Sequence, residues 1–287
     1  LPSNRKIGQR KPSMAPKPSD SQMARGRLMR AVIALSGGMD STALLMRLLA
    51  DGYKVSCLSY EYGQKHNVEL ERAEKNILYL CQNGHQIEHR IVNLESAMGV
   101  FHSALIKGGE QIPEGHYEEQ QMKATVVPNR NAIFSSILYG YALSIALREN
   151  TRVMIALGVH SGDHAIYPDC RPEFYDALMH AFETGNWGSE RVTVNLPYVD
   201  GDKESILRDA IISCDSLGLD FDTVFSNTNT SYSPDEFGRS SGKTGADVER
   251  ILAFHAIGRK DPVEYVDDWD IVLEYAIEAE RQYEAIL

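Results

Sequence analysis

The residues with the clearest capacity for chemistry form the string Ser-Gly-Gly-Met-Asp-Ser at positions 36–41. An apolar run over residues 31–35 precedes it, and apolar side chains recur at helical spacing over residues 42–50, so the glycines are expected at a strand-to-helix turn. Glycine lets the backbone approach an anion closely, the first helical N–H groups point toward that anion, and serine hydroxyls add donors. The string therefore predicts a phosphate-binding loop.

Asp40 lies inside this loop, where its charge would repel a bound phosphate. A cation between the carboxylate and the phosphate would remove that repulsion, and Mg²⁺ prefers oxygen ligands of both kinds. We therefore predict Mg²⁺ beside Asp40. A helix capped by Ser or Asp after a glycine turn is the purely structural alternative.

A second glycine string, Gly-Arg-Ser-Ser-Gly-Lys-Thr at residues 238–244, resembles a Walker A loop. It is one residue short, because Phe237 stands where the first glycine belongs. The polar, turn-rich residues 228–235 before it cannot supply the buried strand that such a loop follows. We interpret this string as a chance match.

The composition favours small-molecule chemistry. A net charge of −11 argues against direct nucleic-acid binding or a membrane surface, and no apolar run approaches the ~20 residues that span a bilayer. The four cysteines are widely spaced, which indicates neither a disulfide framework nor a zinc knuckle and fits reduced thiols in a cytoplasm. We expect a cytoplasmic enzyme.

The elements that must position these residues alternate between strand and helix. Strands are expected at residues 31–35, 54–60, 88–93 and 153–158, and helices at residues 42–50, 67–81, 131–148, 173–184, 203–217, 246–257 and 269–286. This order predicts an α/β fold, a doubly wound parallel sheet that binds ligands at the carboxyl ends of its strands. Residues 98–123 are expected to form a loop that caps the site.

The chain divides into three predicted parts. Residues 1–28 are basic and rich in Pro and Ser, which predicts a disordered arm or a remnant of an expression vector. Residues 29–225 are predicted to form the nucleotide-binding domain, and residues 226–287 a small helical lobe.

Three further strings narrow the substrate. Residues 60–66 place polar groups at the end of the second strand, and Glu69 follows one helical turn later. Arg130 opens the long helix, where it could face a triphosphate as a fixed cation. Residues 158–174 concentrate titratable side chains between a strand and a helix, which is typical of an active edge. An ordinary turn or a solvated helix start is the structural alternative for the first two.

Taken together, four motifs resemble the QueC family, the 7-cyano-7-deazaguanine synthases. They are SGGxDS, Tyr-Gly-Gln-x-His-x-x-Glu-Leu, Val-Pro-x-Arg-Asn and Tyr-Pro-Asp-Cys-Arg-Pro-Glu-Phe. The resemblance implies the fold of the PP-loop ATP pyrophosphatases. It implies that ATP adenylates the carboxylate of 7-carboxy-7-deazaguanine, that ammonia forms the amide, and that a second adenylation gives the nitrile. A homodimer is also implied.

The resemblance and the residue types together give a set of candidate site residues. Asp40, Arg130 and Lys203 are the catalytic candidates. The ATP-binding candidates are Leu35, Ser36, Gly37, Gly38, Asp40, Ser41 and Thr42. The substrate-binding candidates are Tyr62, Gln64, His66, His160, Asp163, Tyr167, Asp169, Arg171, Glu173 and Phe174. Carboxylates among the last group suit a guanine-like N–H edge, and Arg suits a carboxylate.

One departure from the family pattern is large. Where the family carries four zinc-binding cysteines, this chain has Ser231, Ser241, Thr244 and Asp247. Hydroxyls do not replace thiolates as structural zinc ligands, so we predict a lobe without zinc. Three functions stay open: nitrile synthesis, conjugation of the activated deazaguanine to another amine (for instance on a protein partner in antiphage defence), and a nucleotide-binding subunit without turnover.

Overall fold

The computed structural model describes residues 29–116, 120–160 and 167–285. The predicted arm at residues 1–28 and the candidate Asp163 lie outside these described residues. The N-terminal arm therefore stays a prediction. The domain division at residue 225 also stays a prediction.

A five-stranded sheet forms the centre of the molecule, with the order β3-β2-β1-β4-β5 and every neighbouring pair parallel. The strands are β1 (Arg30–Ala34), β2 (Lys54–Glu61), β3 (Glu88–Asn93), β4 (Val153–Ala156) and β5 (Val192–Asn195). The register aligns Arg30 of β1 with Lys54 of β2 and with Val153 of β4. The order reverses at β1, and ligands of such sheets bind at this switch point, beyond the carboxyl ends of the strands. The predicted parallel sheet is confirmed.

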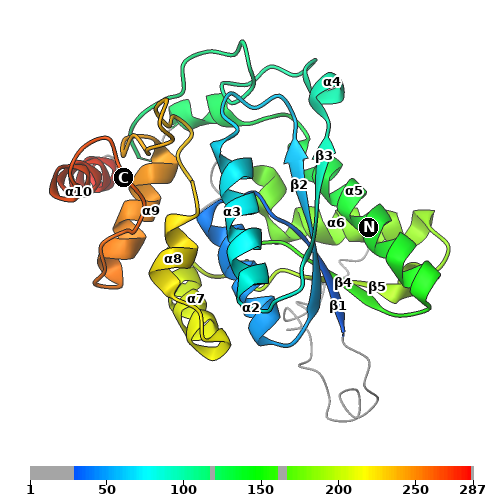
Figure 1. Ribbon diagram of the computed structural model, residues 1–287. Coiled ribbons are helices and arrows are strands. Elements are labelled where there is room, and N and C mark those ends of the chain that lie inside the picture. Colours follow the sequence, from blue (N-terminus) through cyan, green and yellow to red (C-terminus); the bar gives the residue numbers. More distant parts are fainter. Residues whose placement is uncertain (1–28, 117–119, 161–166, 286–287) are drawn as a thin grey trace, which may run out of the picture.

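Helices cover both faces of the sheet (Figure 1). On one face lie α2 (Met39–Ala50), α3 (Val68–Gln82), α7 (Lys203–Leu217) and α8 (Phe221–Ser226). On the other lie α5 (Arg130–Glu149) and α6 (Pro172–Gly185). Because both faces are covered, β1 carries a continuous apolar run in which Ala31, Val32 and Ile33 are wholly buried.

The C-terminal segment packs against this layer. Helix α9 (Gly245–Ala256) lies beside α7, and α10 (Trp269–Glu284) lies beside α9. Among the described residues, the other helical turns are α4 (Glu95–Met98), η1 (Gln120–Thr125), η3 (Pro168–Cys170) and η4 (Ser189–Arg191). No helix in the described part of the chain is long and apolar enough to cross a membrane.

The predicted elements agree with the structure apart from the short ones, which are β5, α4, α8 and the turns η1, η3 and η4. The helix predicted over residues 203–217 has those bounds, and the other long helices begin and end within a few residues of their prediction. Strand β5 and helix α8 were not predicted, since four and six residues are too few to show a clear hydrophobic period.

Candidate active site

The glycine loop joins β1 to α2 at the carboxyl edge of the sheet. Gly37 has φ +90°, and a Cβ atom there would lie 1.9 Å from the carbonyl oxygen of Glu69, so only glycine fits. The hydroxyls of Ser36 and Ser41 lie 2.9 Å apart, and the Ser36 hydroxyl accepts a hydrogen bond from Gly38 N. Gly38 is the N-cap of α2 and has no side chain to cap it. The first N–H groups of the helix are therefore available to an anion.

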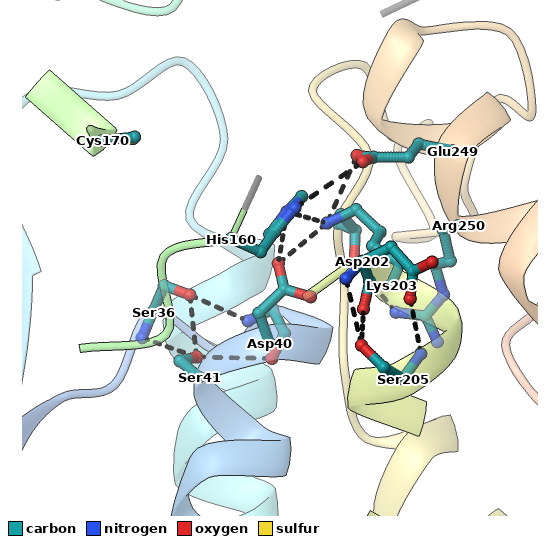
Figure 2. A network of polar contacts seen from close by, with 12 residues as sticks. Ser36, Asp40, Ser41, His160, Cys170, Asp202, Lys203, Ser205, Glu249 and Arg250 are labelled. Carbon is teal, nitrogen blue, oxygen red and sulfur yellow. Dashed lines mark hydrogen bonds and ion pairs between the residues drawn. The ribbon is translucent and has the colours of Figure 1, made fainter. Parts of the chain in front are cut away.

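Four side chains from four segments meet beside this loop (Figure 2). The Lys203 ammonium donates to Asp40 Oδ2 at 2.8 Å and lies 3.4 Å from Glu249 Oε2. It also lies 3.1 Å from Nε2 of the buried His160. Since the ammonium can only donate, Nε2 accepts, and a neutral ring then carries its proton on Nδ1, 3.9 Å from Glu249 Oε1. One ammonium thus faces two carboxylates.

The two carboxylates stabilise the Lys203 ammonium at a position that is otherwise unfavourable for a cation. Lys203 is the first residue of α7, after an N-cap at Asp202 that forms a capping box with Ser205. The positive end of a helix disfavours a cation, so the two carboxylates offset an unfavourable placement. Burial alone would raise the pKa of Asp40, but the charge and the hydrogen bond of Lys203 lower it below the usual value. Asp40 is therefore ionised at neutral pH.

A cavity of about 290 Å³ opens at this edge. Its wall includes ten of the predicted site residues: Ser36, Gly38, Asp40, Ser41, Tyr62, Gln64, His66, Arg130, Tyr167 and Lys203. Glu69, Asn229, Thr230 and Glu249 also line it and were not among the predicted site residues. The structure thus brings the glycine loop, the end of β2, the start of α5 and the start of α7 around one space.

Other predicted residues lie outside the cavity wall. Leu35, Gly37, Thr42 and His160 belong to segments that carry wall residues, but do not themselves line it. Asp169, Arg171, Glu173 and Phe174 lie in η3 and the start of α6, and Arg171 and Glu173 are exposed. From the same motif, Tyr167 and Cys170 line the cavity, and Tyr175, the next residue after the motif, also lines it. Their predicted contacts with substrate stay predictions.

Gln64 lines the cavity, but its side-chain amide forms hydrogen bonds with the backbone at the end of β2. Its Oε1 accepts from Tyr62 N at 2.8 Å, and its Nε2 donates to the Tyr60 carbonyl at 3.3 Å. Gln64 is buried, so these bonds fix the turn at the end of β2. Tyr62 is thereby placed in the wall.

Glu69 and Arg130 both line the cavity and interact electrostatically. Burial raises the pKa of Glu69 to about 7, while the charge of Arg130 lowers it in part. Tyr62, Tyr167 and Tyr232 interact electrostatically with Arg130. A carboxyl group with a pKa near 7 can accept or release a proton at neutral pH, as acid–base catalysis requires.

Arg250 on α9 does not line the cavity, but it binds the segment that does. The Arg250 side chain is 1% exposed, and all five of its N–H donors are used. Two donate to Asp261, one to the hydroxyl of Thr228, one to that of Thr230 and one to a backbone carbonyl. These bonds fix the segment that contains the wall residues Asn229 and Thr230.

Comparison with known proteins agrees with the motifs. The family model described as "Queuosine biosynthesis protein QueC" matches residues 30–258. The 7-cyano-7-deazaguanine synthase of Methanoregula boonei is 41% identical over 237 residues, 83% of this chain and 99% of that protein. That of Caldicellulosiruptor saccharolyticus is 41% identical over 244 residues, 84% and 99% of the two chains. The solved NMN synthetase from Francisella tularensis is similar at a TM-score of 0.40 and 14% identity, over 91% of this chain and 88% of that one, a likeness too loose to support a conclusion.

Proposed function

We propose that this chain, which belongs to the QueC family, converts 7-carboxy-7-deazaguanine to 7-cyano-7-deazaguanine in two ATP-dependent steps. One observation carries the proposal: a glycine loop at the start of α2 and two cations, Lys203 and Arg130, line one cavity at the switch point of the sheet. Carboxylate adenylation needs such a site, because charge accumulates on the departing pyrophosphate.

In the first step a carboxylate oxygen of the substrate attacks the α-phosphorus of ATP and pyrophosphate leaves. The acyl adenylate then loses AMP to ammonia and becomes the amide. In the second step the amide oxygen attacks the α-phosphorus of another ATP, pyrophosphate leaves again, and loss of AMP and of both amide protons gives the nitrile. Each nitrile therefore consumes two ATP and one ammonia.

The loop N–H groups and Lys203 would stabilise the charge on the triphosphate. Residues present beside the loop fit Mg²⁺, because Oδ1 of Asp40 is buried with no hydrogen-bond partner among the described residues. The two carboxylates around Lys203 already exceed its single charge, so a bound triphosphate calls for further positive charge. Mg²⁺ held by Asp40 would supply it and polarise the phosphate oxygens.

Arg130 would be the second cation for the reacting carboxylate and phosphates. The tyrosines around it, Tyr62 and Tyr167 among them, would offer flat surfaces to a bicyclic base. Glu69 would accept the proton that ammonium must lose before it attacks. The predicted contacts of the base with Asp163, Asp169, Arg171 and Glu173, a homodimer and a cytoplasmic location complete the proposal.

The test is product analysis with purified protein, 7-carboxy-7-deazaguanine, ATP, Mg²⁺ and ¹⁵N-ammonium. We expect a ¹⁵N-labelled nitrile by mass spectrometry, with two AMP and two pyrophosphate per nitrile. A deazaguanine adduct that forms only when a protein amine is supplied would replace this function by conjugation. Absence of pyrophosphate under all conditions would leave a nucleotide-binding subunit.

A further inference from the structure

The four positions where the family resemblance implies zinc cysteines meet at one point in the structure. Oδ2 of Asp247 accepts hydrogen bonds from the hydroxyls of Ser231 at 2.9 Å, Ser241 at 2.8 Å and Thr244 at 2.8 Å. It also accepts from Thr244 N at 3.2 Å. We call these four residues the Asp247 cluster. Asp247 is 0% exposed, so the cluster is closed to solvent at its centre.

The direction of these hydrogen bonds is fixed by the backbone. The Ser231 hydroxyl accepts from Ser233 N, the Ser241 hydroxyl from Lys243 N, and the Thr244 hydroxyl from Asp247 N. Each hydroxyl proton is then left to donate to the carboxylate, which as an anion only accepts. The cluster is a carboxylate held by oriented dipoles, and no cationic side chain of the described residues forms an ion pair with it.

These residues do not fit zinc. Three hydroxyls and one carboxylate are poor zinc ligands, and here the hydroxyl protons already point at Asp247. Within the described ranges no group of three or more His, Cys, Asp or Glu side chains could hold a metal ion. The cluster occupies the place of a metal site. Its hydroxyls pair with Oδ2 of Asp247 without a metal, whereas Oδ1 of Asp247 is buried with no hydrogen-bond partner among the described residues.

The Asp247 cluster connects two parts of the active site. Ser231 lies in the cavity wall next to Thr230, while Asp247 lies in the first turn of α9. Two residues further along α9, Glu249 lies 3.4 Å from the Lys203 ammonium. A shift of α9 relative to the wall would therefore move the carboxylate that shares Lys203 with Asp40.

We propose that Asp247 is a positioning residue which, through its three hydroxyl donors, replaces a zinc ion and holds Glu249 against Lys203. The inference rests on the proposed function only in assigning Lys203 to the triphosphate. ATP affinity is therefore the direct measure, since it can be measured whether or not a nitrile forms.

The test measures the Kd of ATP by calorimetry in the full chain with Mg²⁺, well below the melting temperature. We expect Asp247→Asn to raise the Kd about tenfold, which corresponds to about 1.4 kcal/mol. Ser241→Ala should raise it by a smaller factor, and Ser241→Thr, which keeps the donor, should restore it. Ser241 does not line the cavity, so its effect must pass through Asp247.

Two control variants separate positioning from loss of stability. Ala276→Gly removes a buried methyl group of α10 from the α9–α10 contact, and should lower the melting temperature while leaving the Kd within twofold. Asp270→Asn removes an exposed carboxylate from the first turn of α10 and should change neither quantity. A Kd for Asp247→Asn within twofold of wild type would overturn the proposal.

Metal analysis provides a second criterion. Wild-type protein should contain far less than one zinc per chain, and a zinc chelator used in excess Mg²⁺ should leave the Kd unchanged. One zinc per chain, with weaker ATP binding after chelation, would overturn the proposal. A wild type that binds ATP but makes no nitrile would refute the proposed function and leave the positioning role standing.

Discussion

Asp40 and Asp247 are both acidic residues in the first turn of a helix, yet their surroundings are opposite. Asp40 pairs with the Lys203 ammonium and lies near His160, so its pKa is lowered although burial opposes this. Asp247 meets hydroxyls and one backbone N–H, and burial raises its pKa in spite of those bonds. One carboxylate is stabilised by charge and the other by dipoles.

The difference between the two carboxylates corresponds to two roles: Asp40 belongs to a network that can bind a ligand, and Asp247 to one that positions other residues. Lys203 can turn from Asp40 and Glu249 toward a phosphate, because an ion pair is not tied to one geometry. The Asp247 cluster cannot exchange partners in this way, since each of its hydroxyls is also fixed by a backbone N–H. The protein thus places a rearrangeable charge network at the cavity and a rigid dipolar one behind it.

The largest effect is expected where the charge network is broken. Lys203→Met removes the ammonium shared by Asp40 and Glu249, and with it the charge available to the departing pyrophosphate. We expect pyrophosphate release to fall about 100- to 1000-fold, as when a fixed electrostatic donor is lost from an active site. Arg208→Met, on the exposed side of α7, is the matched control and should stay near wild type. If Lys203→Met kept a tenth of the wild-type activity, the charge network around Asp40 would not have the role in catalysis that we assign to it.

A second ion pair on α9 should matter for stability instead. Arg250→Met leaves Asp261 buried without a cation and frees the hydroxyls of Thr228 and Thr230. We expect the free energy of unfolding to fall by about 3–5 kcal/mol, measured in urea. Arg259→Met breaks an exposed pair with Asp222 and should cost about 1 kcal/mol or less. Equal losses in the two variants would contradict the role of burial.

The parts of the fold that were predicted depend on local patterns. Apolar runs identified β1, β2 and β4, since strands buried on both faces read as continuous apolar segments. The alternation of strands and helices predicted the parallel sheet and the edge that carries the site. Strand β5 was missed because it is a short edge strand, and α8 because one and a half turns show no period.

The same limit applies to the site. The glycine loop was found because its residues are consecutive, whereas Glu249 was missed because only packing of α9 on α7 brings it to Lys203. Asp247 was recognised as a position without a cysteine, but its convergence with Ser231 and Ser241 depends on how the chain folds back. Long-range pairing of polar groups leaves no periodic signal in a sequence.

The glycine loop allows a test of the backbone that supports Asp40. Gly37→Ala places a methyl group against the Glu69 carbonyl in addition to straining a left-handed backbone. Gly52→Ala imposes the same strain in open space, so it is the matched control. We expect Gly52→Ala to cost about 1 kcal/mol of unfolding free energy and Gly37→Ala about 1–3 kcal/mol more, with weaker ATP binding only in the latter. Equal costs would show that the loop tolerates a side chain.

Glu69 is a third carboxylate at the cavity, and its pH dependence should place it closer to Asp247 than to Asp40. Its pKa rises from 4.5 to about 7 on folding, so the folded state holds the proton more tightly than the unfolded chain. The free energy of unfolding of the wild type should therefore decrease, relative to Glu69→Gln, as the pH rises from about 4.5 to about 7. Because the side chain is only partly buried, we expect a difference of about 1–2 kcal/mol over this range. Glu71→Gln, exposed on the same helix, is the control. A difference that grows with pH would mean that Arg130 outweighs burial and that Glu69 is ionised like Asp40.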